Sequence, residues 1–256
     1  MSDKAQISSD YLQATKDKYL VNTDVPSPLD RRCVVLGTAY GNIGQQIAYT
    51  LQHRMGYSVK TYTETEVLAS EVSSIPNISK TDTIVFNNGE THLDWMEDQP
   101  EEKIVSVIQN TLTETIIGTG QFVQATKDLN CKKNIVFVGS MAYKSVLNGS
   151  APYCAAKAGL AMFARCMAWE LAPKNYNVFI VHPSNVEDSP MSDKTIQDLA
   201  RYRGISLQEA EAYWSASLPR EDWLQKEDIA NMVARLVSGE MGYASGSQIE
   251  LAGGQR

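Results

Sequence analysis

Three residues near the middle of the chain have types and a spacing suited to proton transfer. Tyr153 and Lys157 are four positions apart, so on a helix their side chains share one face. An ammonium beside a phenol favours the phenolate and lowers the tyrosine pKa toward the range useful near neutral pH. Such a pair is common by chance. Ser140, thirteen residues upstream at the end of the apolar run NIVFVGS, argues against chance because a strand end can present its hydroxyl to the same substrate oxygen.

A glycine-rich turn lies closer to the N-terminus. The segment LGTAYGNIG, residues 36–44, follows the apolar run CVV and precedes a helical pattern. Glycine at such a turn permits unusual backbone angles and close approach to a pyrophosphate, while the helix start offers unpaired N–H groups. Tight packing of strand on helix would require the same glycines. The proton-transfer group favours the nucleotide interpretation and leaves the packing one open.

Apolar runs alternate with helical patterns along most of the chain. The expected strands are CVVLG, YSVKTY, TIVF, NIVFVGS and, near the C-terminus, SQIEL, and the expected helices cover residues 43–54, 101–128 and 152–172. This alternation predicts an α/β fold, a doubly wound Rossmann-type parallel sheet with helices on both faces. We expect residues 1–31, which contain DVPSPLD, to form an N-terminal extension and residues 32–256 to form a single domain.

From Arg32 onward the chain resembles the short-chain dehydrogenase/reductase family. The motifs that carry the likeness are the glycine turn, TIVFNNG at 83–89, Asn110, the Ser140, Tyr153 and Lys157 group, Pro183 with Val186, and GSQIELAGG at 246–254. The resemblance implies an oxidoreductase that moves a hydride between a nicotinamide coenzyme and the carbonyl or secondary alcohol of a small substrate. A coenzyme-binding sensor or partner protein of the same fold, without turnover, is the alternative.

The resemblance also implies a role for each catalytic residue. Tyr153 would give or take the proton of the substrate hydroxyl, and Ser140 would position the carbonyl oxygen. Lys157 would lower the tyrosine pKa and hold the nicotinamide ribose. Asn110 would interrupt its helix and anchor a water in a proton relay; otherwise it is a polar residue in mid-helix that faces solvent.

The coenzyme contacts implied by the resemblance come from several segments: Gly37, Tyr40, Asn42, Ile43, Gly44, Glu64, Asn88, Gly89, Tyr153, Lys157, Pro183 and Val186. Glu64 lies 20 positions after Gly44, where a carboxylate bonds the ribose hydroxyls and repels a 2′-phosphate. No arginine follows it, and Tyr40 stands where phosphate-preferring relatives often carry a basic residue. We therefore expect NAD rather than NADP. If Glu64 is only a solvated charge and Thr63 faces the ribose, the preference stays open.

The chain departs from the family pattern in three places. Gly44 follows Gly41 after two residues instead of one, Glu90 ends the NNG turn, and the loop after Pro183 reads SNVED. A larger departure is the interval from Glu64 to Asn87, whose 23 positions are too few for the family's helix, strand and helix. We predict a six-stranded sheet without the family's third strand. YSVKTY would then be an exposed edge, and the N-terminal extension is the nearest segment that could cover it.

The segment 189–227 interrupts the core pattern between a strand end and a helix that begins near Glu227, where the family carries substrate-covering helices. The candidates to line the substrate pocket are Met191, Leu199, Tyr202, Tyr213 and Trp214. Glu90 and His92 could reach the mouth of the same pocket or be solvated loop residues. The tryptophans are expected to be packing residues and not substrate platforms: Trp95, Trp169, Trp214 and Trp223. The mixed polarity of segment 189–227 does not identify a substrate.

Composition narrows the partners and the compartment. A net charge of −7 argues against nucleic acid or an anionic membrane as the main partner, so we expect a small molecule. The four cysteines lack metal-ligand spacing and predict reduced thiols in a cytoplasmic protein with no metal. The first ten residues are too polar for a signal peptide. The long helices at 101–128 and 152–172 are expected to pair with symmetry mates in a homotetramer or homodimer.

Overall fold

The computed structural model describes residues 31–38, 42–220 and 222–255. Six parallel strands form one sheet in the order β2-β1-β3-β4-β5-β6. The strands are β1 (Arg32–Leu36), β2 (Ser58–Tyr62), β3 (Thr83–Phe86), β4 (Lys133–Val138), β5 (Tyr176–Pro183) and β6 (Gln248–Leu251). The predicted six-stranded Rossmann-type sheet is therefore confirmed. β5 is the longest of the six strands and is buried throughout, although only its end was predicted from the sequence.

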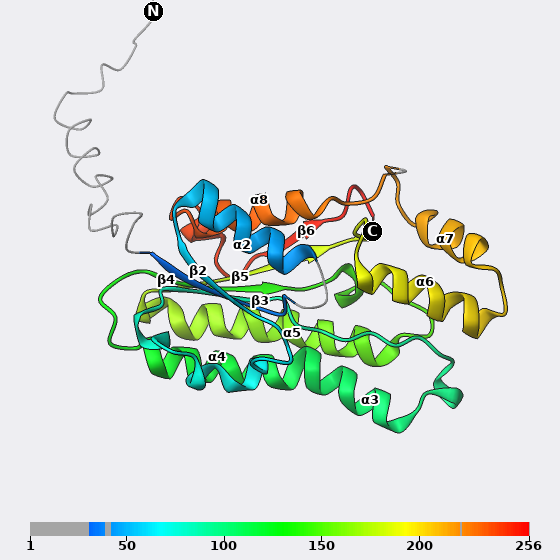
Figure 1. Ribbon diagram of the computed structural model, residues 1–256, viewed down its shortest axis with the longest axis horizontal. Coiled ribbons are helices and arrows are strands. Elements are labelled where there is room, and N and C mark those ends of the chain that lie inside the picture. The colour runs from blue at the N-terminus through cyan, green and yellow to red at the C-terminus, as the bar shows by residue number, and fades with distance from the viewer. Residues whose placement is uncertain (1–30, 39–41, 221, 256) are drawn as a thin grey trace, which may run out of the picture.

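Helices cover both faces of the sheet (Figure 1). One face carries α2 (Asn42–Met55) and α8 (Lys226–Val237), and the other carries α3 (Glu101–Ile108), α4 (Glu114–Thr126) and α5 (Ala151–Leu171). Alternate residues of each strand point to opposite faces, so Val34 packs in the α4–α5 core whereas Val35 packs in the α2–α8 core. Two apolar cores, one on each face, therefore hold the strand ends in fixed positions.

The interval between β2 and β3 contains no strand. It holds two short 3₁₀ turns, η2 (Ala69–Ser74) and η3 (Ile78–Lys80), and the backbone turns between them at Asn77 with φ of 62°. β2 is consequently an edge strand, as the short interval predicted. The N-terminal extension proposed to cover this edge lies, except for Arg31, outside the described residues.

The predicted helix at 101–128 is broken. A π-helical turn, η5 (Gln109–Thr113), separates α3 from α4, and Asn110 lies within it. Single π turns inside helices are frequent at functional sites because they displace side chains and free backbone groups. The break places the backbone carbonyl of Asn110 within reach of the turn that follows β3, as described below.

Gly118 allows η2 to lie directly on α4. A Cβ at Gly118 would be 1.8 Å from the carbonyl oxygen of Ala69, far inside van der Waals contact. We expect Gly118→Ala to lower the free energy of unfolding by about 1–3 kcal/mol, as overpacking does, in urea titrations. Gly120→Ala is the matched control, because a Cβ there meets nothing within 4 Å. It should stabilise α4 by about 0.5–1 kcal/mol, and equal effects of the two changes would contradict the packing argument.

Beyond β5 the chain forms two helices, α6 (Pro190–Arg203) and α7 (Leu207–Ser215), before it returns to the core in α8. Figure 1 shows α6 and α7 at the end of the sheet where the carboxyl ends of the strands lie, outside the two covering layers. They occupy the segment expected to cover the substrate. One packing prediction was wrong: Trp169 on α5 is 86% exposed.

Candidate active site

A cavity of about 460 Å³ opens at the carboxyl ends of the strands. Residues that follow five of the six strands line it, and α5, α6 and α7 complete its wall. Its lining includes Ile43 near the start of α2, the helix that follows β1, and Asn87 directly after the neighbouring strand β3. The connections that leave β1 and β3 go to opposite faces of the sheet (Figure 1). Doubly wound folds bind their ligands at this switch point because the diverging loops leave a crevice.

The three residues of the proton-transfer group meet in this cavity. Tyr153 and Lys157 project from α5, and Ser140 follows β4. Lys157 Nζ lies 5.6 Å from the centre of the Tyr153 ring and donates to the carbonyl oxygen of Val138 at 3.0 Å. The Tyr153 hydroxyl lies 3.8 Å from Met191 Sδ. Tyr153 and Lys157, which the sequence placed on one helix face, therefore lie in the same cavity as Ser140.

Burial dominates the electrostatics of this group. It raises the pKa of Tyr153 to about 12, while a hydrogen bond with Ser140 acts in the opposite direction. Burial also lowers the pKa of Lys157 to about 8. The expected lowering of the tyrosine pKa by Lys157 is therefore not found in the protein alone, because the lysine is itself poorly solvated and its ammonium is directed to Val138. At neutral pH the phenol keeps its proton.

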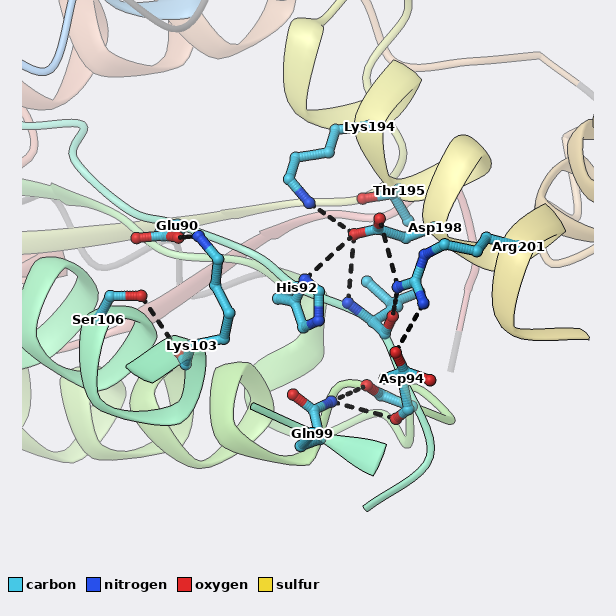
Figure 2. Close-up of polar contacts among 12 residues, drawn as sticks. Glu90, His92, Asp94, Gln99, Lys103, Ser106, Lys194, Thr195, Asp198 and Arg201 are labelled. Carbon is cyan, nitrogen blue, oxygen red and sulfur yellow. Dashed lines mark hydrogen bonds and ion pairs between the residues drawn. The ribbon is translucent and has the colours of Figure 1, made fainter. Parts of the chain in front are cut away.

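Asn110 is partly buried and is not among the residues that line the cavity. Its backbone carbonyl accepts a hydrogen bond from Asn88 Nδ2 at 2.6 Å, and its side-chain amide donates to Glu90 Oε2 at 2.7 Å. Glu90 also pairs with Lys103 at 3.2 Å (Figure 2). Glu90, the residue that departs from the family's turn, therefore orients the Asn110 side chain, and the Asn110 backbone carbonyl orients the Asn88 side chain. Asn110 stands behind the cavity wall.

The glycine turn is tightly packed. Gly37 has φ of 80°, and a Cβ there would lie 2.6 Å from the backbone of Asn87 and Asn88. A Cβ at Gly44 would lie 2.9 Å from the Gly37 carbonyl oxygen, which accepts a bond from Asn87 Nδ2 at 2.7 Å. Packing alone thus requires both glycines, and the same close approach brings the start of α2 to the end of β3. Tyr40 and the side chain of Asn42 lie outside the described part of the chain.

Other coenzyme candidates reach the cavity. Its lining includes Ile43, Glu64, Asn88, Gly89, Pro183 and Val186. Thr63, the alternative ribose contact, is instead engaged by Glu66, which accepts bonds from the Thr63 N–H at 2.8 Å and its hydroxyl at 3.0 Å. At the end of β2 it is therefore Glu64, and not Thr63, that faces the cavity. Gly37 and Gly44, which were also predicted to contact the coenzyme, are not among the residues that line the cavity.

Helices α6 and α7 form the outer wall, and all five residues proposed from segment 189–227 line the cavity: Met191, Leu199, Tyr202, Tyr213 and Trp214. Figure 2 shows how α6 is held to the segment after β3. Arg201 pairs with Asp94 at 2.7 Å and lies 3.7 Å from Asp198, which accepts from Lys194 at 2.6 Å. His92 lies 3.8 Å from Asp198 and is not among the lining residues. The ion pair between Arg201 and Asp94 therefore stabilises the position of α6 against the segment after β3.

Sequence reasoning missed His182. Its imidazole is fully buried, with Nδ1 at 3.0 Å from the carbonyl oxygen of Ser140 and Nε2 at 2.8 Å from Gln248 Oε1. The ring stacks on Tyr143 at 3.9 Å, and burial lowers its pKa, so the ring is neutral at pH 7. The histidine thereby holds the backbone that carries the Ser140 hydroxyl. A polar residue inside the otherwise apolar run VFIVHP was the available signal.

The cavity fits the nicotinamide coenzyme that the fold implies. A Cβ at Gly89 would lie 3.5 Å from Lys157 Nζ, an ordinary van der Waals contact, so the turn after β3 lies directly beside the buried ammonium. That ammonium has three donors and makes one hydrogen bond among the described residues, which leaves donors for ribose hydroxyls. Glu64 lies toward the β2 end of the cavity, and Pro183 and Val186 lie at the β5 end. No cluster of metal-ligating side chains exists within the described ranges.

Comparisons with known proteins identify the family of this chain. The model of the short chain dehydrogenase family matches residues 39–200. A 3-oxoacyl-(acyl-carrier-protein) reductase of Rickettsia bellii is 28% identical over 200 residues, 77% of this chain and 76% of that protein. Sorbitol-6-phosphate 2-dehydrogenase of Escherichia coli is 22% identical over 216 residues, 84% of this chain and 83% of that protein.

Solved structures share the fold. Actinorhodin polyketide ketoreductase with NADPH superposes with a TM-score of 0.77 at 22% identity, covering 90% of this chain and 98% of that one. NAD⁺-bound xylitol dehydrogenase gives 0.78 at 18% identity, covering 88% and 98%. The chain belongs to the short-chain dehydrogenase family. It is an NAD(P)-dependent oxidoreductase, and neither the site nor its relatives favour a role without turnover. Among the helices that the structure describes, none has the length and apolarity to cross a membrane.

Proposed function

We propose that the protein reduces the carbonyl group of a small organic substrate, with Tyr153 as the proton donor. The observation that carries the proposal is the meeting of Tyr153, Ser140 and Lys157 in one cavity at the switch point of the sheet. Because burial raises the pKa of Tyr153 to about 12, the phenol is protonated at neutral pH. A protonated donor suits reduction, whereas oxidation would first require the phenol to lose its proton.

Each residue has a separate task in this proposal. The Ser140 hydroxyl binds the carbonyl oxygen and, with the Tyr153 hydroxyl, orients it; Tyr153 then delivers its proton to that oxygen. Lys157 binds the ribose hydroxyls and stabilises the phenolate that remains. His182 and the Asn110, Asn88 and Glu90 contacts hold the strand ends that carry these groups. The bound coenzyme supplies the hydride that the carbonyl carbon accepts.

A substrate screen tests the proposal. Purified protein is mixed with ketones and aldehydes of different sizes in the presence of NADH or NADPH, and loss of the reduced-coenzyme absorbance is followed. We expect turnover of at least one carbonyl compound. Absence of turnover with every compound and both coenzymes, by protein that binds coenzyme, would favour the non-catalytic alternative.

We propose NAD as the preferred coenzyme because Glu64 faces the cavity at the end of β2. Glu64→Gln should raise the Kd for NAD about ten-fold, since it weakens a charged hydrogen bond, and should raise the Kd for NADP less or not at all. Calorimetric titration with each coenzyme measures this change. Glu66→Gln, two positions on and outside the cavity, is the control and should leave both constants unchanged. Tighter binding of NADP than of NAD to the wild-type protein would overturn the assignment.

We also propose that the chain assembles through α4 and α5 into a homodimer or homotetramer. Ile116 and Ile117 on α4 are 39% and 44% exposed, and Met162 and Trp169 on α5 are 56% and 86% exposed. Exposed apolar side chains on adjacent helices are typical of an interface. Light scattering should give two or four times the chain mass of 28.3 kDa, and Trp169→Glu should lower it. A wild-type particle of 28.3 kDa at micromolar concentration would contradict the proposal.

We propose a cytoplasmic location for the protein. The proposal rests on cysteines that are all free, at positions 33, 131, 154 and 166. Free thiols are typical of a reducing compartment.

A further inference from the structure

The last residue of α6 brings a positive charge to the substrate end of the cavity. Arg203 lines the cavity together with Tyr202 and Tyr213. Its Nε donates to the Tyr202 hydroxyl at 3.1 Å, and its Nη2 donates to the Tyr213 hydroxyl at 3.2 Å. The guanidinium lies 4.3 Å from the centre of the Tyr213 ring and 5.6 Å from that of Tyr202. Two tyrosines thus hold the cation in place.

The Arg203 charge lacks an acidic partner among the described residues, although Arg201 on the same helix pairs with Asp94 and Asp198. Of the charged residues that line the cavity, Glu64 follows β2 and Lys157 lies beside Tyr153. Arg203 is therefore the charged group of the wall formed by α6 and α7. A guanidinium has five N–H donors and uses two on the tyrosines, so three remain.

The position of Arg203 is fixed before any ligand arrives. Tyr202 donates its hydroxyl hydrogen to the Asn148 carbonyl at 3.1 Å, and its ring packs edge-on against Trp95 at 5.1 Å. A planar guanidinium held in this way is preorganised for two parallel hydrogen bonds to a carboxylate or a phosphate. The Tyr213 hydroxyl accepts from Arg203 and can donate its own hydrogen to the same oxyanion.

Arg203 is far from the reacting group. Met191, at the start of α6, lies against the Tyr153 hydroxyl, and Arg203 follows twelve positions later on the same helix. At 1.5 Å per residue the backbones of these two positions are about 18 Å apart along the helix axis. The Arg203 side chain points back toward the start of the helix, so its guanidinium is somewhat closer to Tyr153 than that. A ligand that contacts both ends must therefore be elongated.

We infer that the substrate is an elongated carbonyl compound whose far end carries an oxyanion, a carboxylate or a phosphate monoester, bound by Arg203 with Tyr213. The inference rests on the proposed carbonyl reduction and adds the class of its substrate. The carbonyl lies at Tyr153, the substrate chain follows the wall formed by Met191, Thr195 and Leu199 of α6, and the anion lies at the α6–α7 corner.

The test uses three matched long-chain methyl ketones that end in a carboxylate, a phosphate monoester or the neutral methyl ester. With wild-type protein, KM should be at least about ten-fold lower for one anionic ketone than for the ester, with similar kcat, and the better anion identifies the ligand. Arg203→Met should remove this preference, so that KM for the anionic ketone becomes about equal to KM for the ester measured with the same variant. Arg203→Lys should retain part of it, because the charge stays and the planar fork is lost.

Arg220→Met is the control for net charge, since Arg220 pairs with Asp222 and lies outside the cavity lining. It should retain the preference. Equal KM values for ester and anions in the wild-type protein, or the same loss in Arg220→Met, would overturn the inference. If no ketone is reduced, calorimetric binding of the same compounds decides. Arg203-dependent binding would keep the anion subsite and reject the reaction, whereas anion binding unchanged in Arg203→Met would reject the subsite.

Discussion

Replacing Tyr153 with phenylalanine is expected to lower kcat for carbonyl reduction by at least about a hundred-fold, because a positioned acid contributes about 10²–10⁴-fold to such a step. The ring stays and only the hydroxyl is lost, so the Kd of the coenzyme should be nearly unchanged. Steady-state kinetics and coenzyme titration on the same preparation separate the two quantities.

Tyr143→Phe is the matched control for this change. Tyr143 lies ten positions before Tyr153 and is half-buried, but its hydroxyl donates to Glu250 and it is not among the residues that line the cavity. Its loss should alter kcat by a small factor only. A Tyr153→Phe variant that retains most of the wild-type kcat would show that another group supplies the proton.

Lys157→Met is expected to make the coenzyme-free protein more stable at pH 7, by up to about 3 kcal/mol, while it impairs function. Burial lowers the pKa of Lys157 from 10.5 to about 8, and a difference of one between the folded and unfolded pKa values corresponds to about 1.4 kcal/mol. The folded chain is therefore destabilised at neutral pH by keeping this lysine charged. Coenzyme affinity and kcat should both fall in the variant, because one ammonium serves the ribose and the phenolate.

The stability difference between Lys157→Met and the wild-type protein should depend on pH. Between pH 8 and 10.5 the unfolded chain keeps the Lys157 proton that the folded chain has lost. The free energy of unfolding of the wild-type protein therefore rises with pH in this range, relative to that of the variant. The advantage of Lys157→Met should thus be complete below pH 8 and vanish above 10.5, in urea unfolding at several pH values. Lys144→Met, which removes a surface ion pair with Glu250, should change stability by less than about 1 kcal/mol. A less stable Lys157→Met protein at pH 7 would contradict this expectation.

The fold was predictable because its signals are local. Apolar strands that alternate with helical patterns predict a parallel doubly wound sheet, and the short interval from Glu64 to Asn87 excludes an extra strand. Ser140, Tyr153 and Lys157 could be placed together because strand ends and helix faces have fixed geometry. Asn110 could be assigned to a helix break only through resemblance, since propensity does not predict a π turn.

What the sequence did not reveal depends on contacts between distant segments. The bond from Asn110 to Glu90 spans 20 positions and that from His182 to Ser140 spans 42, and no local pattern predicts either pairing. The exposure of Trp169 was likewise unpredicted, because residue type favours burial whereas its position on the helix places it outside. Arg203 was overlooked beside the aromatic candidates Tyr202 and Tyr213, although those two hold it at the cavity.

Transfer of deuterium from the coenzyme tests the central claim most directly. The protein is incubated with a ketone from the screen and with reduced nicotinamide coenzyme deuterated at its transferable position, and the product is analysed by mass spectrometry. We expect an alcohol with one deuterium on the former carbonyl carbon from the wild-type protein, and almost none from Tyr153→Phe in the same time. An unlabelled alcohol, or equal labelling by both proteins, would contradict the proposed role of Tyr153 in carbonyl reduction.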